Sequence, residues 1–508
     1  MENNKTKPEQ NKNKPTQGKN NRPRTAAESL IDDVLSSDAL LFHDQYHEAY
    51  IAQYGDGRQI LKLSSKSFKE WLAHSYWVKE QKPLPRDTDS QVVQTLTGHA
   101  IFESSTYQLQ VRLARDGEEL WYDLADGRAI RISSTEWKLV AKPPILFRRM
   151  QQKSQVEPER DGEVDHLRNY INVASDDDWL LFLVFVVAAF IPDFPHPLLI
   201  LHGPQGAGKT TPMRVIKQLV DPSVIQGMPL PDRIPEFVQL ADHHAFLFFD
   251  NLSNLPTKMS DALARASTGD SFSKRQLFTD SDDIVYHIQK TIALNGINQV
   301  ITKADLLDRS ILIKLERITP DMRMPEADFW SAFNHDKPQI LGAIFDVLVK
   351  ALALYPDIEL DEAPRMADFT RWGCAIAEAS GYGQENFLKA YRDNIARQND
   401  EAIDASPVAK AVIGLMHDLE DTNVWQGTPE KLLGTLNRRL DTINSSSSPL
   451  WPKAPEWMTR RLNEAQTNLS AIGIYVEVER INGSRIITIT INEPTADSDS
   501  KSAQTVIS

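Results

Sequence analysis

One short segment constrains the fold of this 508-residue chain more than any other. An apolar run at 198–201 leads into a glycine-rich loop, and a helical pattern follows from Thr211. The loop fits the spacing G-x-x-x-x-G-K-[ST] in the strand–loop–helix context that this motif requires. The loop residues are Gly203, Pro204, Gln205, Gly206, Ala207, Gly208, Lys209 and Thr210. The sequence therefore predicts a phosphate-binding loop after a buried strand.

Each residue type in this loop has a chemical reason to be there. Glycines let backbone N–H groups come close to phosphate oxygens, and the start of the following helix adds the positive end of its dipole. Lys209 is expected to reach the β- and γ-phosphates, and the Thr210 hydroxyl is expected to bind Mg²⁺. Thr211 completes the predicted nucleotide site, so we expect ATP and Mg²⁺ as ligands.

Two later strands end in polar residues that suit the same site. The apolar run 245–249 ends in Asp250, a carboxylate suited to hold Mg²⁺ through its water shell. Asn251 follows, and its amide can orient a water molecule but cannot accept its proton. The run 291–294 ends in Asn295, which can sense the γ-phosphate and orient the attacking water. Asp250 and Asn295 join Lys209 as predicted catalytic residues.

Arg309 is the fourth predicted catalytic residue. It precedes the apolar run 311–315, where an arginine can complete the nucleotide site of a neighbouring subunit. The alternative is a salt bridge within the chain to Asp305 or Asp308.

This ordered set of motifs resembles the superfamily 3 helicases, especially phage- and poxvirus-type primase-helicases and related ATP-binding proteins of bacterial mobile elements. The resemblance covers about residues 163–320 and includes the segment ALARASTGDSFSKRQLF at 262–278. It implies an AAA+-like P-loop core and a homo-oligomer, with a hexameric ring as one form. It also implies a hairpin that grips single-stranded DNA, with Lys274 and Arg275 as DNA contacts. The acidic tip at 279–283 leaves open a hairpin that touches no DNA.

The fold class predicted for the whole chain is α/β, in consecutive parts joined by a polar linker at 151–162. The parts are a disordered basic tail (1–25), an N-terminal α/β module (26–150), the P-loop ATPase core (163–320), a helical segment (325–400), a winged-helix domain (406–492) and a disordered tail (493–508).

The winged-helix prediction comes from three helical patterns at 407–419, 428–440 and 455–472, followed by two alternating runs around Asn482-Gly483. Arg460 and Arg461 lie near the start of the third pattern and are predicted DNA contacts. Acids nearly balance the basic residues here, so a winged helix that binds protein is the alternative.

Composition excludes several classes of protein. The net charge of −14 rules out a uniformly basic nucleic-acid coat, so any DNA contact is a local patch. The single cysteine excludes an internal disulfide and fits a reducing cytoplasm. The apolar run 180–191 is shorter than the roughly 20 residues that span a bilayer, so we expect a core helix and no membrane partner.

The sequence thus predicts an ATP-hydrolysing DNA replication protein of phage or mobile-element type. We expect a helicase-like motor on single-stranded DNA that has other replication proteins among its partners. The alternative is a slow ATPase that acts as a nucleotide-gated loader or switch, because Asn251 stands where many ATPases have an acid.

Overall fold

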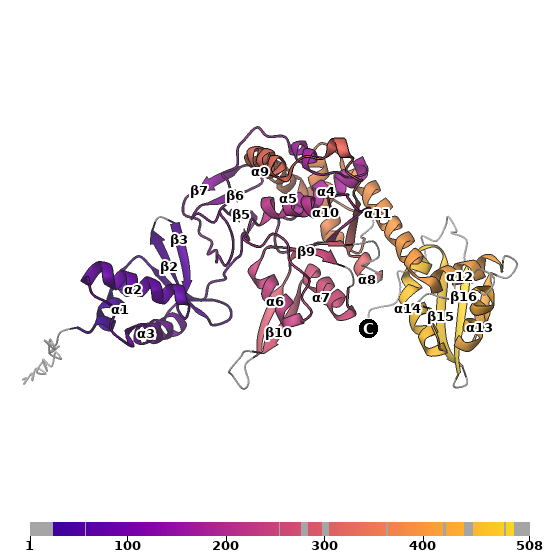
Figure 1. Cartoon of the computed structure of the whole chain (residues 1–508), viewed down its shortest axis with the longest axis horizontal. Coiled ribbons are helices and arrows are strands. Elements are labelled where there is room, and N and C mark those ends of the chain that lie inside the picture. Colours follow the sequence, from indigo (N-terminus) through magenta and orange to yellow (C-terminus); the bar gives the residue numbers. More distant parts are fainter. Residues whose placement is uncertain are drawn as a thin grey trace, which may run out of the picture. The chain divides into compact units, whose positions relative to one another are not determined.

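The computed structural model describes residues 24–55, 57–252, 255–275, 283–296, 304–361, 364–419, 423–440, 451–481 and 484–491. Its contacts divide the chain into two compact units, Met1–Gln108 and Leu109–Ser508 (Figure 1). Most of the two predicted tails, most of the hairpin tip and the Asn482-Gly483 turn lie outside the described residues.

The first unit is a small α/β module with a three-stranded antiparallel sheet in the order β1-β2-β3. Its elements are α1 (Ala26–Ser36), β1 (Leu40–His43), β2 (Ala49–Gly55), β3 (Gly57–Lys62), α2 (Lys66–Glu80) and α3 (Thr88–Phe102). The sequence did not lead us to expect α3. Its buried residues Val92, Leu96 and Ala100 are spaced by four, which places them on the one helix face that closes the core.

The second unit begins with an antiparallel sheet in the order β4-β5-β6-β7. The strands are β4 (Leu113–Asp116), β5 (Glu119–Asp123), β6 (Ala129–Ile132) and β7 (Trp137–Val140). We predicted one module over 26–150, whereas the compact units divide after Gln108. The physical reason is a shared core, because the Tyr122 ring lies 5.4 Å from that of Phe190 and 5.6 Å from that of Phe345. Figure 1 shows this sheet beside α9 (Glu326–Leu354).

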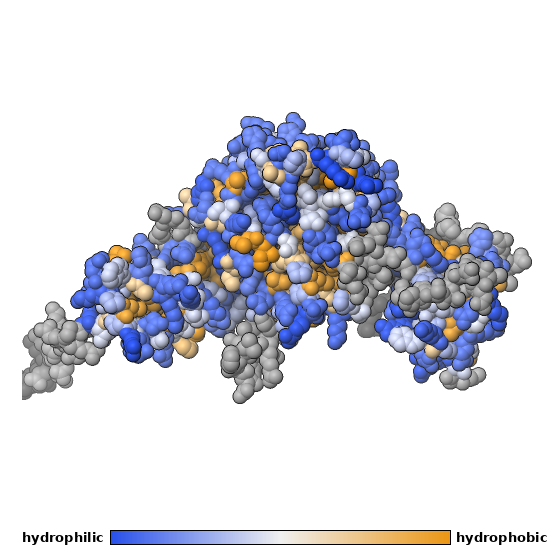
Figure 2. Space-filling model, in the orientation of Figure 1, coloured by the Kyte–Doolittle hydropathy of each residue, from blue (hydrophilic) through white to orange (hydrophobic). Residues whose placement is uncertain are grey.

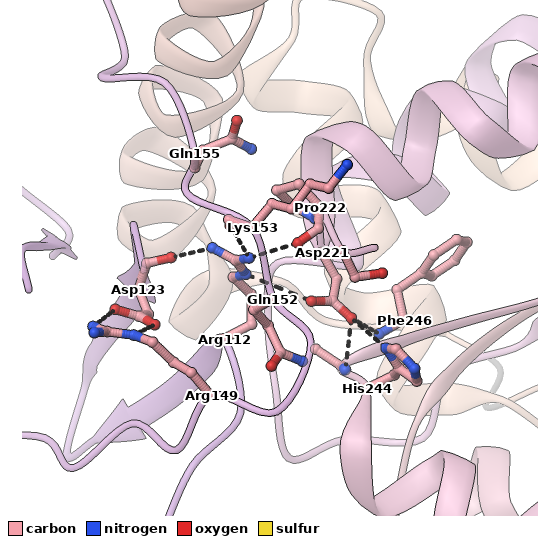
Figure 3. A network of polar contacts seen from close by, with 12 residues as sticks. Arg112, Asp123, Arg149, Gln152, Lys153, Gln155, Asp221, Pro222, His244 and Phe246 are labelled. Carbon is pink, nitrogen blue, oxygen red and sulfur yellow. Dashed lines mark hydrogen bonds and ion pairs between the residues drawn. The ribbon is translucent and has the colours of Figure 1, made fainter. Parts of the chain in front are cut away.

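A buried ionic network ties this sheet to the helix that follows the glycine-rich loop (Figure 3). The guanidinium of Arg112 donates to the carbonyl oxygens of Asp123, Lys153 and Pro222 at 2.7–2.8 Å. Its Nε lies 3.5 Å from Asp221, which also accepts from the fully buried Lys217 at 2.8 Å. Burial lowers the pKa of Lys217, and the nearby Asp221 opposes that shift. Because Lys153 is part of the network, the predicted linker lies against the core here.

The centre of the second unit is a four-stranded parallel sheet in the order β13-β8-β12-β9. Its strands are β8 (Leu198–His202), β9 (Phe246–Leu252), β12 (Thr291–Gly296) and β13 (Ser310–Lys314). The helical elements along this stretch are η1 (Val164–Tyr170), α4 (Asp176–Ala188), α5 (Thr210–Val220), α6 (Ile234–His243), α7 (Thr257–Thr268), α8 (Ala304–Leu307) and η2 (Pro320–Met322). This is a mixed α/β architecture with a parallel sheet, as the sequence predicted. The core helix predicted within 180–191 is also confirmed, since α4 is buried from Asp178 onward.

An antiparallel hairpin stands between α7 and β12. Its strands are β10 (Asp270–Arg275) and β11 (Asp283–Ile288), paired from Asp270 with Ile288 to Arg275 with Asp283. The predicted hairpin is therefore present at the predicted place in the chain.

Helices dominate the next stretch, as expected for 325–400. They are α9, η3 (Tyr355–Asp357), α10 (Ala367–Ala379) and α11 (Gln384–Ala405). By length and composition alone, the stretch Glu326–Asp357 is long and apolar enough to cross a membrane. Half of its most apolar part is buried inside the protein, and core helices of soluble proteins can be as long and as apolar.

The last described part contains three helices and a three-stranded antiparallel sheet in the order β14-β16-β15. Its elements are α12 (Pro407–His417), β14 (Val424–Gly427), α13 (Pro429–Leu440), α14 (Pro455–Ala471), β15 (Ile474–Ile481) and β16 (Ser484–Ile491). The three helices and the hairpin lie where the sequence predicted them, and β14 is an additional strand that pairs with β16. In the view of Figure 2 most of the coloured surface is hydrophilic.

Candidate functional site

The glycine-rich loop joins the carboxyl end of β8 to the start of α5. Gly206 and Gly208 have φ values of +84° and +64°, in the left-handed region that favours glycine. A Cβ atom on Gly203 would lie 2.6 Å from the carbonyl oxygen of Leu315, and one on Gly208 would lie 2.9 Å from Ile318 Cδ1. The glycines are therefore required both by backbone conformation and by close packing against the segment after β13. Pro204, Gln205 and Gly206 are exposed, and Ala207 is buried.

Lys209 is the last residue before α5, and its side chain folds back over the loop. Its Nζ donates to the carbonyl oxygens of Gly203 at 2.9 Å and of Pro204 at 3.2 Å. The helix begins at Thr210, one residue earlier than predicted, and Thr211 follows in the first turn. The ammonium group thus lies across the loop at the amino end of α5, where the helix dipole also favours an anion.

The two predicted magnesium ligands meet across the sheet. The Thr210 hydroxyl donates to Asp250 Oδ1 at 3.2 Å, although the two residues are 40 positions apart. The parallel pairing explains this contact, because β8 and β9 both end at the edge of the sheet that carries the loop. Hydroxyl and carboxylate oxygens are ligands that Mg²⁺ accepts.

Asn295 connects this pair to the next strand tip. Its Oδ1 accepts from the backbone N–H of Asn251 at 2.9 Å, and its Nδ2 lies 3.5 Å from the Thr210 hydroxyl. Asn295 is almost fully buried, whereas Asn251 is exposed and has a φ of +56°. The structure therefore brings Lys209, Thr210, Asp250 and Asn295 to one edge of the sheet.

Arg309 lies at the opposite end of the strands from the glycine-rich loop. Its carbonyl oxygen accepts from the N–H of Leu198, the first residue of β8, at 2.8 Å. The four residue steps of β8 separate this end from the loop by about 13 Å. Of the two acids considered as salt-bridge partners, Asp308 pairs with Arg365 at 2.8 Å, and Arg309 has interactions of its own within the chain. Arg309 is thus not part of the cluster around Lys209.

Asn172 is a site residue that sequence reasoning missed. Its Nδ2 donates to the carbonyl oxygens of Ala207 at 2.8 Å and of Glu316 at 2.7 Å. The side-chain amide of Asn172 therefore links the loop to the segment after β13. It lies in the segment between η1 and α4, and no spacing in the sequence relates it to the loop.

The predicted DNA contacts lie on two separate elements. Lys274 and Arg275 belong to β10, and their side chains are outside the described residues. Arg460 and Arg461 lie on α14, and both pair with Glu464, at 3.2 Å and 2.8 Å. These pairs leave about one net positive charge on this turn of the helix. Contact with DNA stays a prediction for all four residues.

The residues at the loop fit a magnesium–nucleotide complex. Loop N–H groups, the Lys209 ammonium and the start of α5 suit phosphate oxygens, and Thr210 with Asp250 offers two oxygen ligands. Such a site needs few protein ligands, because Mg²⁺ usually keeps several waters and binds substrate phosphates. In the part of the chain that the structure describes, no group of three or more His, Cys, Asp or Glu side chains is arranged to hold a metal ion.

The fold and the loop together define a mixed α/β protein with a parallel sheet whose carboxyl edge carries a glycine-rich loop. Residues 164–401 match the family model described as actinomycete integrative conjugative element replication protein. Residues 408–503 match the C-terminal domain of the same RepA protein. These two matches cover about two thirds of the chain, which belongs to the RepA family of replication proteins of actinomycete integrative conjugative elements. The prediction of a mobile-element replication protein is thereby confirmed.

Several solved structures are similar over long stretches. The apo C-terminal region of NrS-1 is 11% identical over 92% of this chain and 100% of that one, with a TM-score of 0.44. The SCCmec type IV protein Cch, described as an active helicase, is 10% identical over 89% and 93%, with a TM-score of 0.45. The JCV helicase is 10% identical over 43% and 66%, with a TM-score of 0.22. At these sequence identities and TM-scores, the similarities assign no activity to this chain. A search of curated proteins found no match to its sequence.

Proposed function

We propose that the 203–210 loop is a P-loop that binds ATP with Mg²⁺, and that the protein is an ATP-hydrolysing, helicase-like motor of the superfamily 3 type. The observation that carries the proposal is the contact between Thr210 and Asp250 at the mouth of the glycine-rich loop. Asp250 lies in β9, which is separated from β8 by β12 alone. A hydroxyl at the start of the helix after the loop and a carboxylate at the end of another strand of the sheet form the usual pair around magnesium in P-loop enzymes.

In this proposal each residue has one task. Loop N–H groups and Lys209 bind the phosphates, while Thr210 and Asp250 hold the metal ion. Mg²⁺ would supply charge neutralisation at the transferred phosphoryl group. Asn295 orients the attacking water, since its carboxamide is already fixed by the N–H of Asn251. Arg309 would complete the nucleotide site of the next subunit in a homo-oligomeric ring, because it lies too far from its own loop.

Single-stranded DNA is the proposed track. The family is one of replication proteins, and the β10–β11 hairpin offers Lys274 and Arg275 on a strand. The helices and the small sheet of 407–491 are proposed as a winged helix that contacts DNA or other replication proteins, with Arg460 and Arg461 as its basic residues. The protein would act in the cytoplasm of the cell that carries the element.

A second function has a specific observation in its favour. Asn251 stands directly after Asp250, and it cannot take a proton from water at neutral pH. The site would then bind ATP and hydrolyse it slowly, so that the protein acts as a nucleotide-gated loader or switch without unwinding.

The test is steady-state ATP hydrolysis with and without single-stranded DNA. The motor predicts turnover that rises at least about tenfold with DNA and that Lys209→Ala abolishes. If turnover stays near background with DNA while ATP still binds, the motor is excluded and the switch remains. Lys258→Ala is the matched control, because Lys258 is an exposed lysine on α7 of the same unit.

A further inference from the structure

Two arginines outside every motif discussed above converge on the glycine-rich loop. They lie in the segment that continues β13, whose carboxyl end is at the same sheet edge as the loop. At the position that a Cβ of Gly206 would occupy, Arg323 Nη2 is 3.9 Å away and Arg317 Nε is 4.0 Å away. Since both distances are measured to one point, these two nitrogens lie within about 8 Å of each other.

The segment that carries the arginines is fastened to the loop. The N–H of Ile318 donates to the carbonyl oxygen of Gly206 at 3.3 Å, and Asn172 joins Ala207 to Glu316. Leu315 packs against Gly203, as described above. The backbone of Arg317 is therefore held against the loop by contacts on both sides of it, and Arg323 follows six residues later in the same segment.

Neither arginine has an acidic partner among the described residues. Both side chains are exposed, and Glu316 and Asp321 in the same segment form no ion pair with them in the described part of the structure. Two guanidinium groups at this separation repel each other. An anion bound between them would attract both groups and offset this repulsion. The nearest anion-binding element is the loop itself.

We infer that Arg317 and Arg323 bind the phosphate chain of the nucleotide in the same subunit that supplies the loop. This inference rests on the proposed ATP site and adds a second, cationic wall to it. Lys209 approaches the phosphates as a single ammonium charge, whereas the two guanidinium groups offer planar sets of N–H donors that match phosphate oxygens. The arginines act in cis, unlike Arg309 at the other end of the sheet.

The test is equilibrium binding of ATP, in the presence of Mg²⁺, to the full-length protein and its variants. Arg317→Ala and Arg323→Ala should each weaken ATP binding about fivefold to tenfold, and the double variant should weaken it at least about 30-fold. Arg317→Lys and Arg323→Lys should retain part of the affinity because they keep the charge. Arg392→Ala, on an exposed arginine of α11, should bind like the wild type.

Inorganic tripolyphosphate separates phosphate contacts from contacts to the base or ribose. Measured by competition, its affinity for the double variant should be lower than its affinity for the wild type by the same factor as for ATP. If ATP or tripolyphosphate binds the double variant within twofold of the wild type while Lys209→Ala loses ATP, this inference is overturned and the proposed P-loop stands. If the wild type itself binds no ATP, the proposed function fails, and the inference falls with it.

Discussion

The hydroxyl of Thr210 and the carboxylate of Asp250 form a hydrogen bond of 3.2 Å across the parallel sheet. One residue starts α5 and the other lies in β9, so the contact depends on the order of the strands and not on closeness in sequence. Thr210 and Asp250 would hold the magnesium ion of a bound nucleotide in place of this hydrogen bond. The pair should therefore matter for ATP hydrolysis more than for the stability of the fold.

Asp250→Asn should lower ATP turnover at least about 100-fold, because the neutral amide cannot supply the negative charge that holds Mg²⁺. Thr210→Ser is the matched variant, since it keeps the hydroxyl and should retain most of the turnover. Steady-state hydrolysis over a range of Mg²⁺ concentrations measures both. Equal turnover of Asp250→Asn and the wild type would exclude Asp250 as a metal ligand.

Asn251 should limit the hydrolysis rate. Its φ of +56° decides the choice of variant, because aspartate tolerates this region and glutamate is expected to cost about 1 kcal/mol there. Asn251→Asp should therefore raise turnover about tenfold or more by adding a group that can accept a proton from water. Single-turnover hydrolysis separates this step from binding. Slower or unchanged hydrolysis would show that the missing base does not limit the rate.

Arg309 should act on a neighbouring subunit. Arg309→Ala and Lys209→Ala are each expected to abolish turnover alone, whereas mixed oligomers contain some sites with both residues intact. Mixing the two variants should restore a measurable part of the activity, with a maximum near equal amounts. An absence of rescue, in mixtures shown to exchange subunits, would place the role of Arg309 within its own chain.

The buried side chain of His196 should make the free energy of unfolding depend on pH. The side chain is buried, and burial lowers its pKa to about 4 despite a contact of 3.0 Å from Nε2 to the Ala188 carbonyl oxygen. The unfolded chain, with a pKa near 6.5, binds more protons between these two values, so this histidine lowers the free energy of unfolding as the pH falls from 6.5 to 4. The full loss is about 3 kcal/mol. Thermal unfolding of His196→Gln, which keeps an N–H donor, should depend less on pH over this range. An identical pH dependence of the variant and the wild type would show that His196 does not cause this loss of stability.

The sequence predicted two parts of the site, the glycine-rich loop with its own spacing motif and the polar residues at strand ends. Asp250 and Asn295 each follow a buried apolar run, and parallel strands place such ends together at one sheet edge. Asn172, Arg317 and Arg323 escaped prediction because their closeness to the loop depends on where the segment before α4 and the segment after β13 run in space. No local pattern encodes those paths.

For the fold, too, local elements could be predicted from the sequence, whereas contacts between distant elements could not. The helices and hairpin of the last 100 residues follow from caps and alternation, such as Thr428 at the start of α13, where its hydroxyl accepts from Lys431 N–H at 3.3 Å. The sheet β4–β7 has equally clear local signals, yet its association with the larger unit depends on rings such as Tyr122 and Phe345 that are far apart in sequence. Arg112 and Asp221 add to this association from within the core.

The central claim is that the glycine-rich loop binds the phosphates of ATP. The most direct measurement is the affinity of the full-length protein for ATP in the presence of Mg²⁺, compared between the wild type, Lys209→Ala and the control Lys258→Ala. We expect the wild type and the control to bind alike, and Lys209→Ala to lose at least about 100-fold in affinity. Equal affinity of all three proteins for ATP would contradict the claim.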